Sequence, residues 1–150
     1  MSANPASGVV DAVEQTLTLA QTWVHWDGKP RLSEEGDREY TPLKALRRQG
    51  DHIIDHLAEV DELLAGHLPM ADEWQASAVT FPSEMAPFAQ SDYLEAAQRL
   101  RRLARVFFLR YEVAGSEEWD RPREDSWTLR EIADHLATAW YAEQIGDLTP

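Results

Sequence analysis

Apolar residues recur every three or four positions in four long segments of the chain, a spacing typical of amphipathic helices. The first segment runs from Val9 to Trp26, and Asp27-Gly28-Lys29-Pro30 predicts its end because proline cannot continue a helix. The polar residues 31–40 then favour a small β-hairpin. The second segment opens at Thr41-Pro42, where threonine can cap a helix and proline fits its first turn, and it ends at Gly66.

The second half of the chain contains the other two helical segments. One opens at Ser91 and ends at Gly115, and a series of arginines occupies its polar positions. A polar loop follows at residues 116–126, and the last helix is predicted over residues 128–145. Thr128-Leu129-Arg130-Glu131 has the form of a capping box, in which the threonine and glutamate side chains both accept backbone N–H bonds.

Residues 68–90 join the second and third segments in the longest irregular stretch of the chain, where several prolines argue against a continuous helix. A connection of this length can cross from one end of a bundle to the other, which leaves the helices it joins parallel. The pattern therefore predicts an all-α protein: a four-helix bundle with a long crossover between its second and third helices. We expect one domain over residues 9–150, preceded by a disordered N-terminus at residues 1–8.

Composition and charge narrow the environment and the partners. The chain has 27 acidic against 14 basic residues and a net charge of −13, so we expect neither nucleic-acid binding nor docking on anionic membranes. It contains no apolar run long enough for a transmembrane helix, and residues 1–8 lack the pattern of a signal peptide. The absence of cysteine excludes disulfides and thiolate chemistry from the chain. These features favour a cytoplasmic protein.

Three of the five histidines have a spacing that suits a metal site. His52 and His56 are four positions apart, so both lie on one face of the second helix, and Glu131 and His135 have the same spacing in the last. Imidazoles with a carboxylate suit zinc, nickel or iron(II). At about 100° per residue, the three histidines lie at the edges of the apolar stripes, where they face either a shared cleft or water.

Two stretches resemble the DinB-like superfamily of four-helix bundles. Trp127-Thr128-Leu129-Arg130-Glu131-Ile132-Ala133-Asp134-His135-Leu136-Ala137 is similar to the Trp-Ser/Thr-x-Arg-Glu-x-x-x-His-Leu opening of a helix common in that group. The second stretch is Tyr40-Thr41-Pro42, continuing through Arg47-Arg48 to residues 51–59. With the number and lengths of the helices and the central crossover, the resemblance covers roughly residues 9–146.

The resemblance implies a divalent metal held by histidines from two or three helices. Ala139 stands where the last helix of the family often carries a second histidine, so His52, His56 and His135 would be the ligands here, with Glu131 as a fourth ligand or general base. The related mycothiol-dependent maleylpyruvate isomerases similarly use a Glu-x-x-x-His pair. The implied activity is thiol transfer, isomerisation or hydrolysis on a small molecule, with any thiol coming from a cosubstrate.

A second interpretation remains open. The edge histidines can instead make structural hydrogen bonds, Glu131 can serve only as the capping-box acid, and His25 and His67 lie at helix ends, where a cation is favourable. The chain would then be a non-catalytic small-molecule-binding protein or a dimeric interaction module with a degenerate metal site. Likewise, the arginines of the third helix form either a solvated face or, with Trp127 and Trp140, the wall of a binding pocket. A homodimer fits both interpretations.

Overall fold

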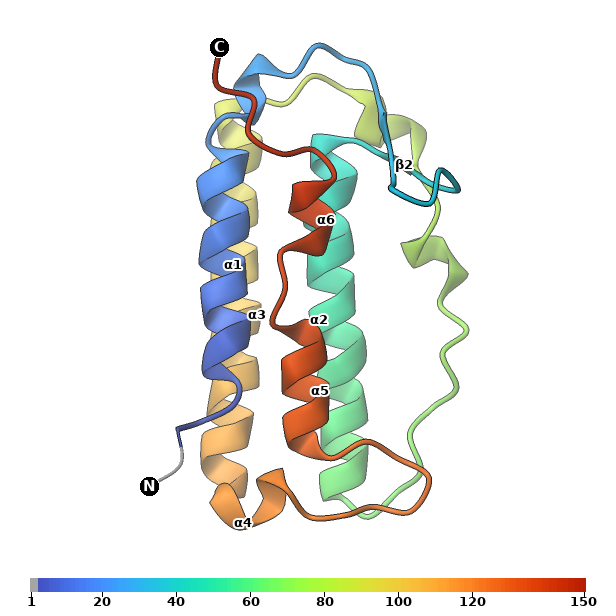
Figure 1. The fold of residues 1–150 in the computed structure, drawn as a ribbon, viewed down its shortest axis with the longest axis vertical. Helices are drawn as coiled ribbons and strands as arrows, with labels where there is room; N and C mark the ends of the chain where they lie inside the picture. Colours follow the sequence, from blue (N-terminus) through green and yellow to red (C-terminus); the bar gives the residue numbers. More distant parts are fainter. Residues whose placement is uncertain (1–2) are drawn as a thin grey trace.

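The computed structural model describes residues 3–150, and most of them are helical (Figure 1). The α-helices are α1 (Ser7–Ala20), α2 (Pro42–Leu64), α3 (Gln90–Ala114), α4 (Ser116–Trp119), α5 (Leu129–Leu136) and α6 (Trp140–Glu143). Short 3-10 turns are η1 (Trp23–His25), η2 (Gln75–Ser77) and η3 (Pro82–Met85). Within the described residues, no helix combines the length and apolar character needed to cross a membrane. The predominance of helices confirms the predicted all-α class.

The predicted hairpin is present as two short strands. β1 (Arg31–Leu32) pairs with β2 (Glu39–Tyr40) in antiparallel fashion, with Arg31 opposite Tyr40. Directly after it, the Thr41 side chain accepts a hydrogen bond from the Lys44 backbone N–H at 3.2 Å, which caps α2 as predicted.

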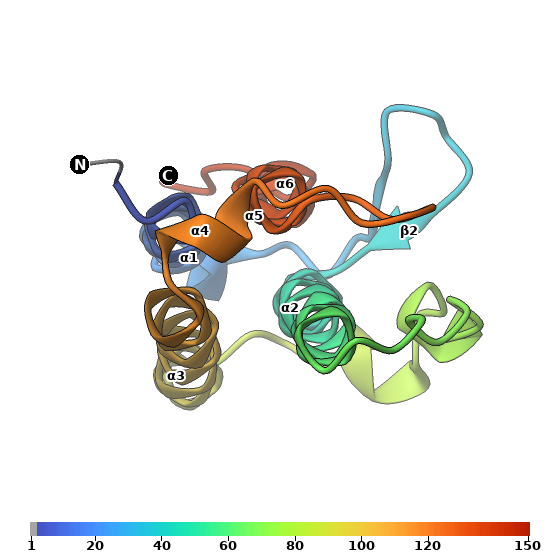
Figure 2. The same ribbon diagram turned by 90° about the horizontal axis from the view of Figure 1, so that it is seen from below.

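The long helices lie side by side, and their directions follow from the connections between them. In Figure 1, α2 and α3 run in the same direction, while α1 and the successive helices α5 and α6 run the opposite way. The crossover, residues 65–89, makes this possible because it returns the chain along the outer side of α2 to the end where α2 began. Viewed along the helices in Figure 2, α5 and α6 lie one behind the other, next to α1 and α2.

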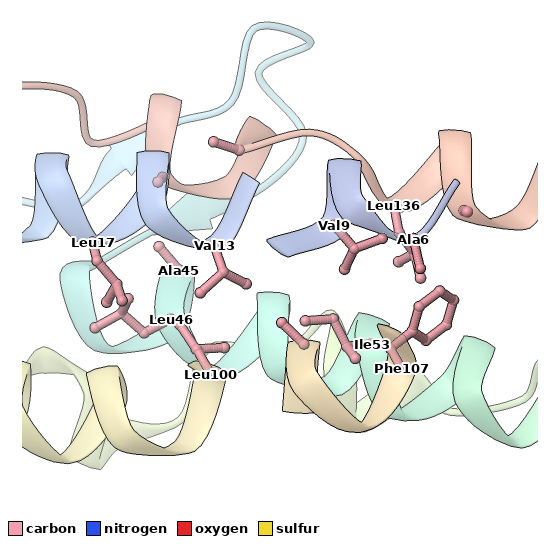
Figure 3. Close-up of a cluster of buried hydrophobic side chains, with 14 of the residues drawn as sticks. Ala6, Val9, Val13, Leu17, Ala45, Leu46, Ile53, Leu100, Phe107 and Leu136 are labelled. Atoms are coloured by element: carbon pink, nitrogen blue, oxygen red, sulfur yellow. The ribbon is translucent and has the colours of Figure 1, made fainter. Parts of the chain in front are cut away.

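One continuous apolar core fills the space between α1, α2, α3 and α5 (Figure 3). Its members include Val9, Val13, Leu17, Leu46, Ile53, Leu100, Phe107 and Leu136. Each fully buried side chain of this size contributes about 2 kcal/mol to the free energy of unfolding. This burial determines which face of each helix points inward, and hence which residues remain at the margins.

The start of the chain is more ordered than the sequence pattern suggests. Helix α1 begins at Ser7 instead of Val9, and Ala6 is fully buried. Asn4 Nδ2 donates a hydrogen bond to the Phe108 carbonyl at 3.2 Å, which ties this segment to α3. The expected disorder of residues 1–8 therefore does not hold for residues 4–8, whereas residues 1 and 2 lie outside the described part of the chain.

Two predicted elements differ from the structure. The polar loop at residues 116–126 contains helix α4, because Trp119 is buried and its Nε1 donates to the Tyr111 carbonyl at 3.0 Å. The last helix is interrupted at residues 137–139 and divides into α5 and α6. At that break, the Thr138 hydroxyl accepts the Trp140 backbone N–H at 3.1 Å, just before α6 begins.

Arg47 connects the crossover to α2. Its Nε bonds Glu84 Oε2 at 2.6 Å, its Nη1 bonds Asp51 Oδ2 at 3.0 Å, and its guanidinium lies over the Phe81 ring at 4.6 Å. The same guanidinium donates to the carbonyl oxygens of Ala76, Ser77 and Val79. Because these partners come from both the helix and the crossover, Arg47 holds the crossover against one side of α2.

We expect Arg47→Met to lower the free energy of unfolding by about 3 kcal/mol, because it leaves the buried Glu84 carboxylate without its partner. Chemical denaturation measures this loss, and amide hydrogen exchange should show faster exchange in residues 75–85. The double variant Arg47→Met/Glu84→Gln should recover part of the stability. Equal exchange rates in the variant and the native chain would show that Arg47 does not hold the crossover.

Candidate metal centre

Three histidines from two helices meet at one point beside the core. His52 and His56 come from α2 and His135 comes from α5, and one candidate ligand atom from each lies within 4.8 Å of the others. The Nε2 atoms of His52 and His135 are 3.0 Å apart. The ring centroids of His56 and His135 are separated by 5.0 Å. The histidines predicted from their spacing therefore do share one place in the fold.

Local sequence explains why His135 turns toward α2. The Thr128 hydroxyl accepts the Glu131 backbone N–H at 3.1 Å and fixes the start of α5. The helix then buries one stripe, formed by Leu129, Ile132, Ala133 and Leu136. His135 lies next to Leu136 at the margin of that stripe, where α5 packs along α2. The imidazole is consequently held near the two histidines of α2 while one side stays open to solvent.

Glu59 holds the ring of His56 in place. Its Oε1 lies 2.8 Å from His56 Nδ1, three residues earlier on the same helix. A carboxylate bound to one ring nitrogen fixes the tautomer and leaves the other nitrogen as a ligand, an arrangement common around protein metal sites. Glu59 was missed as a functional residue in the sequence, although its i, i+3 spacing from His56 was visible.

Burial keeps two of the imidazoles neutral. The pKa of His52 falls to about 3, first because the ring is buried and then because His56, His135 and Arg48 lie close. Burial and His56 also lower the pKa of His135, while Glu59 opposes that shift. A histidine must be unprotonated to bind a metal, so both rings are in the ligand form at neutral pH.

The hydrogen bond between His52 and His135 has a further requirement. A short contact between two Nε2 atoms is stable only if one ring carries the hydrogen and the other offers its lone pair. A metal ion at this point would replace that hydrogen and be bound by both lone pairs.

Aromatic side chains flank the cluster on both sides. The Trp127 ring lies 5.0 Å from His135 and is nearly parallel to His56, with an interplanar angle of 13°. Tyr141 lies 5.7 Å from His52, edge to face. Trp140, which we expected beside Trp127, instead packs edge to face on Tyr141 with centroids 5.4 Å apart. Trp127 and Tyr141 therefore supply the flat apolar surfaces next to the histidines.

The cluster opens into three adjoining hollows between α2, the crossover and the loop before α5. One of about 410 Å³ includes His52, Arg48 and Tyr141 in its lining. Others of about 710 and 720 Å³ both include His56 and Glu59. Spaces of this size accommodate small organic ligands, and two of the three histidines, His52 and His56, are accessible from them.

Glu131 lies apart from this constellation. It is exposed in the first turn of α5, one turn before His135, and within residues 3–150 the group of potential metal ligands comprises the three histidines without it. Its predicted role as a general base remains a prediction. His25 and His67 are also exposed and belong to no such group in the described residues.

The arginines of α3 do not line the cleft. Arg99 pairs with Glu95, Arg101 with Glu14 and Arg110 with Asp61, so they belong to a solvated, ion-paired face. The cleft instead receives Arg48 from α2 and Arg38 from the hairpin. Arg48 was missed in the sequence, although Arg48, His52 and His56 follow one another at four-residue intervals and so share a helix face.

Comparison of the chain with protein-family models, with curated proteins and with solved structures gives no match. What remains as a guide to function is the geometry of the histidine cluster, together with the similarity of residues 40–59 and 127–137 to DinB-like sequences.

The depressed pKa of His52 makes the metal-free protein sensitive to acid. Between about 3, the pKa in the folded state, and 6.5, the ordinary value, the unfolded chain binds more protons than the folded one. The stability from the neutral ring is therefore complete above pH 6.5 and is lost as the pH falls toward 3. We expect His52→Gln to show a shallower loss of stability over this window, measured by denaturation at several pH values, with His67→Gln as the control. Histidine NMR should place the His52 titration well below 6.5, and a normal midpoint would contradict this prediction.

Proposed function

We propose that this protein is a DinB-like four-helix bundle that binds a divalent metal through His52, His56 and His135 and uses it to act on a small molecule. The observation that carries the proposal is the meeting of three imidazoles, with one ligand atom from each within 4.8 Å of the others, beside open hollows lined by His52 and His56. Zinc is the first candidate, and nickel or iron(II) would suit the same donors.

The closest pair of donor atoms fits such an ion. With metal–nitrogen bonds of about 2.1 Å, two ligands of a tetrahedral ion lie about 3.4 Å apart. The two Nε2 atoms of His52 and His135, at 3.0 Å, need only a small separation to reach that value. Three protein ligands leave one position for water or substrate, the arrangement typical of catalytic rather than structural zinc. Glu59 binds Nδ1 of His56 and so orients its ring, as carboxylates next to metal-binding histidines commonly do.

The reaction class follows from this donor set and the family resemblance. A bound ion would supply a lowered pKa for water or for a substrate thiol, and so a nucleophile near neutral pH. Thiol transfer, isomerisation or hydrolysis are the proposed reactions, and any thiol must belong to a cosubstrate because the chain has no cysteine. Trp127 and Tyr141 would orient the substrate by contact with its flat or apolar parts. Glu131 remains the proposed general base, and a homodimer and a cytoplasmic location remain predictions from sequence.

Metal content tests the proposal directly, because the chain provides matched controls. We expect one zinc ion per chain in protein incubated with zinc and then desalted. His52→Ala, His56→Ala and His135→Ala should each lose at least 90% of it, since loss of a supporting partner alone weakens metal binding about 10- to 100-fold and loss of a ligand removes a metal bond outright. His25→Ala and His67→Ala, which change histidines outside the cluster, should retain it. Elemental analysis with circular dichroism measures both metal and folding.

The opposite result would also be clear. If the native chain binds none of zinc, nickel or iron(II), the metal-dependent function is wrong, and a non-catalytic small-molecule-binding module becomes the better interpretation. Equal metal loss in the control variants would point to non-specific binding instead.

The supporting carboxylate can be separated from the proposed base. We expect Glu59→Gln to weaken zinc binding about tenfold or more, because the amide holds His56 less firmly and makes its ring a weaker base. Glu131→Gln should leave the zinc affinity nearly unchanged, since Glu131 lies outside the ligand group. Competition with a chromophoric chelator measures both affinities. Comparable losses in the two variants would indicate that Glu131 is itself a ligand.

A further inference from the structure

Arg48 is a buried cation without an acidic partner. Only 8% of the residue is exposed. Its Nη2 donates a hydrogen bond to the Tyr141 hydroxyl at 3.1 Å, and its guanidinium carbon lies 4.8 Å from the centroid of the Tyr141 ring. Its Nε is buried without a hydrogen-bond partner. Among residues 3–150, no carboxylate comes within ion-pair distance of this guanidinium.

This isolation is unusual in so acidic a chain. The chain has 27 acidic residues, and the adjacent Arg47 pairs with both Glu84 and Asp51. A buried charge without a counter-ion is unfavourable, and folding alone does not explain its retention. A missing anionic partner does explain it.

The position of Arg48 indicates where that partner would lie. Arg48 precedes His52 by one helical turn on the same face of α2, and both line the hollow of about 410 Å³. Tyr141 lines it too, and because its hydroxyl oxygen accepts from Arg48, its hydrogen is free to be donated to a ligand. A negative group in this hollow would meet a guanidinium and a phenol beside a ligand of the proposed metal.

We propose that Arg48 and Tyr141 form a carboxylate-binding subsite, so that the substrate or cosubstrate of this site is a small organic carboxylate. This inference rests on the proposed function for its reaction, although the binding itself does not require the metal. The bound carboxylate would neutralise Arg48 and hold the rest of the molecule toward the histidines.

The other charges of the hollow favour a carboxylate over a phosphate. Its lining also contains Arg38, from the hairpin, and four acidic residues, Asp51, Asp55, Asp72 and Glu73. Asp51 is already paired with Arg47, whereas Asp55 on α2 and Asp72 and Glu73 on the crossover add negative potential. Because the four acidic residues outnumber the two arginines, they would repel a phosphate dianion more strongly than a singly charged anion. A singly charged, planar carboxylate needs one guanidinium, whose fork of N–H groups matches its two oxygens.

Benzoate and benzamide are suitable probes, because they share a flat aromatic shape that can pack on Tyr141 in the lining of the hollow and differ in charge. Calorimetry on zinc-loaded protein should show benzoate binding at least tenfold more tightly than benzamide. We expect Arg48→Gln to weaken benzoate binding about tenfold or more, as loss of a charge-assisted bond does, and to leave zinc content and benzamide binding unchanged. Arg99→Gln, an exposed arginine paired with Glu95, is the matched control and should change neither.

A metal-free comparison separates this inference from the proposed function. In the His135→Ala background, benzoate should still bind, and adding Arg48→Gln should abolish that binding. If the native chain binds no zinc but benzoate binding depends on Arg48, the subsite stands and the metal proposal fails. If zinc binds and benzoate affinity is unaffected by Arg48→Gln, the subsite is wrong and the metal proposal stands.

Two further outcomes would overturn the assignment. Inorganic phosphate that binds more tightly than benzoate, in an Arg48-dependent way, would make this a phosphate site. A large drop in the thermal midpoint of Arg48→Gln with undiminished benzoate affinity would show a purely structural arginine. Should Arg48→Gln fail to fold, Arg48→Lys replaces it: the charge is kept, the fork is lost, and benzoate affinity should still fall severalfold while zinc binding persists.

Discussion

The packing of α5 along α2 is the constraint on which the site depends. Each helix buries one stripe, and a side chain at the margin of a stripe is held by its neighbours yet remains within reach of water. His52, His56 and His135 occupy such margins on facing helices, so burial lowers the pKa of His52 and His135 while the cleft keeps the cluster open. A position deeper in the core would have enclosed the imidazoles, and one farther out would have left them solvated and apart.

Helix α2 combines three tasks on different faces. Ile53 and Val60 enter the core, Arg47 holds the crossover, and Arg48 and His52 face the cleft. Because Arg47 fastens the crossover to the helix that carries His52 and His56, the crossover wall of the cleft depends on contacts made by that same helix. A change in the crossover contacts is therefore expected to alter access to the cluster before it alters the core.

Periodic features of the chain were predictable, and tertiary features were not. The hairpin, the Thr41 cap and the i, i+4 pair in α2 depend on neighbours in sequence, and all are present. The break at residues 137–139 depends on packing instead. A Cβ added at Gly8 would lie 2.9 Å from the Cβ of Ala137, so the start of α1 passes very close to the break. The periodicity of the sequence does not show this contact between distant segments. The sequence pattern does not distinguish Arg48 from Arg47 for a related reason, since only the folded chain shows that Arg48 lacks a counter-ion.

Three clustered imidazoles and an unpaired guanidinium are unfavourable features for a fold to keep. The contact of two ring nitrogens through one hydrogen, and a cation buried beside them, are less favourable for folding than apolar side chains of similar volume would be. Proteins retain such features where binding compensates for them, because a ligand that binds only the folded state adds stability in proportion to the logarithm of its concentration. The two features also need opposite charges: the imidazole cluster suits a cation, and Arg48 suits an anion. Their proximity on one face of α2 therefore fits a metal ion and an anionic small molecule bound side by side better than it fits either alone.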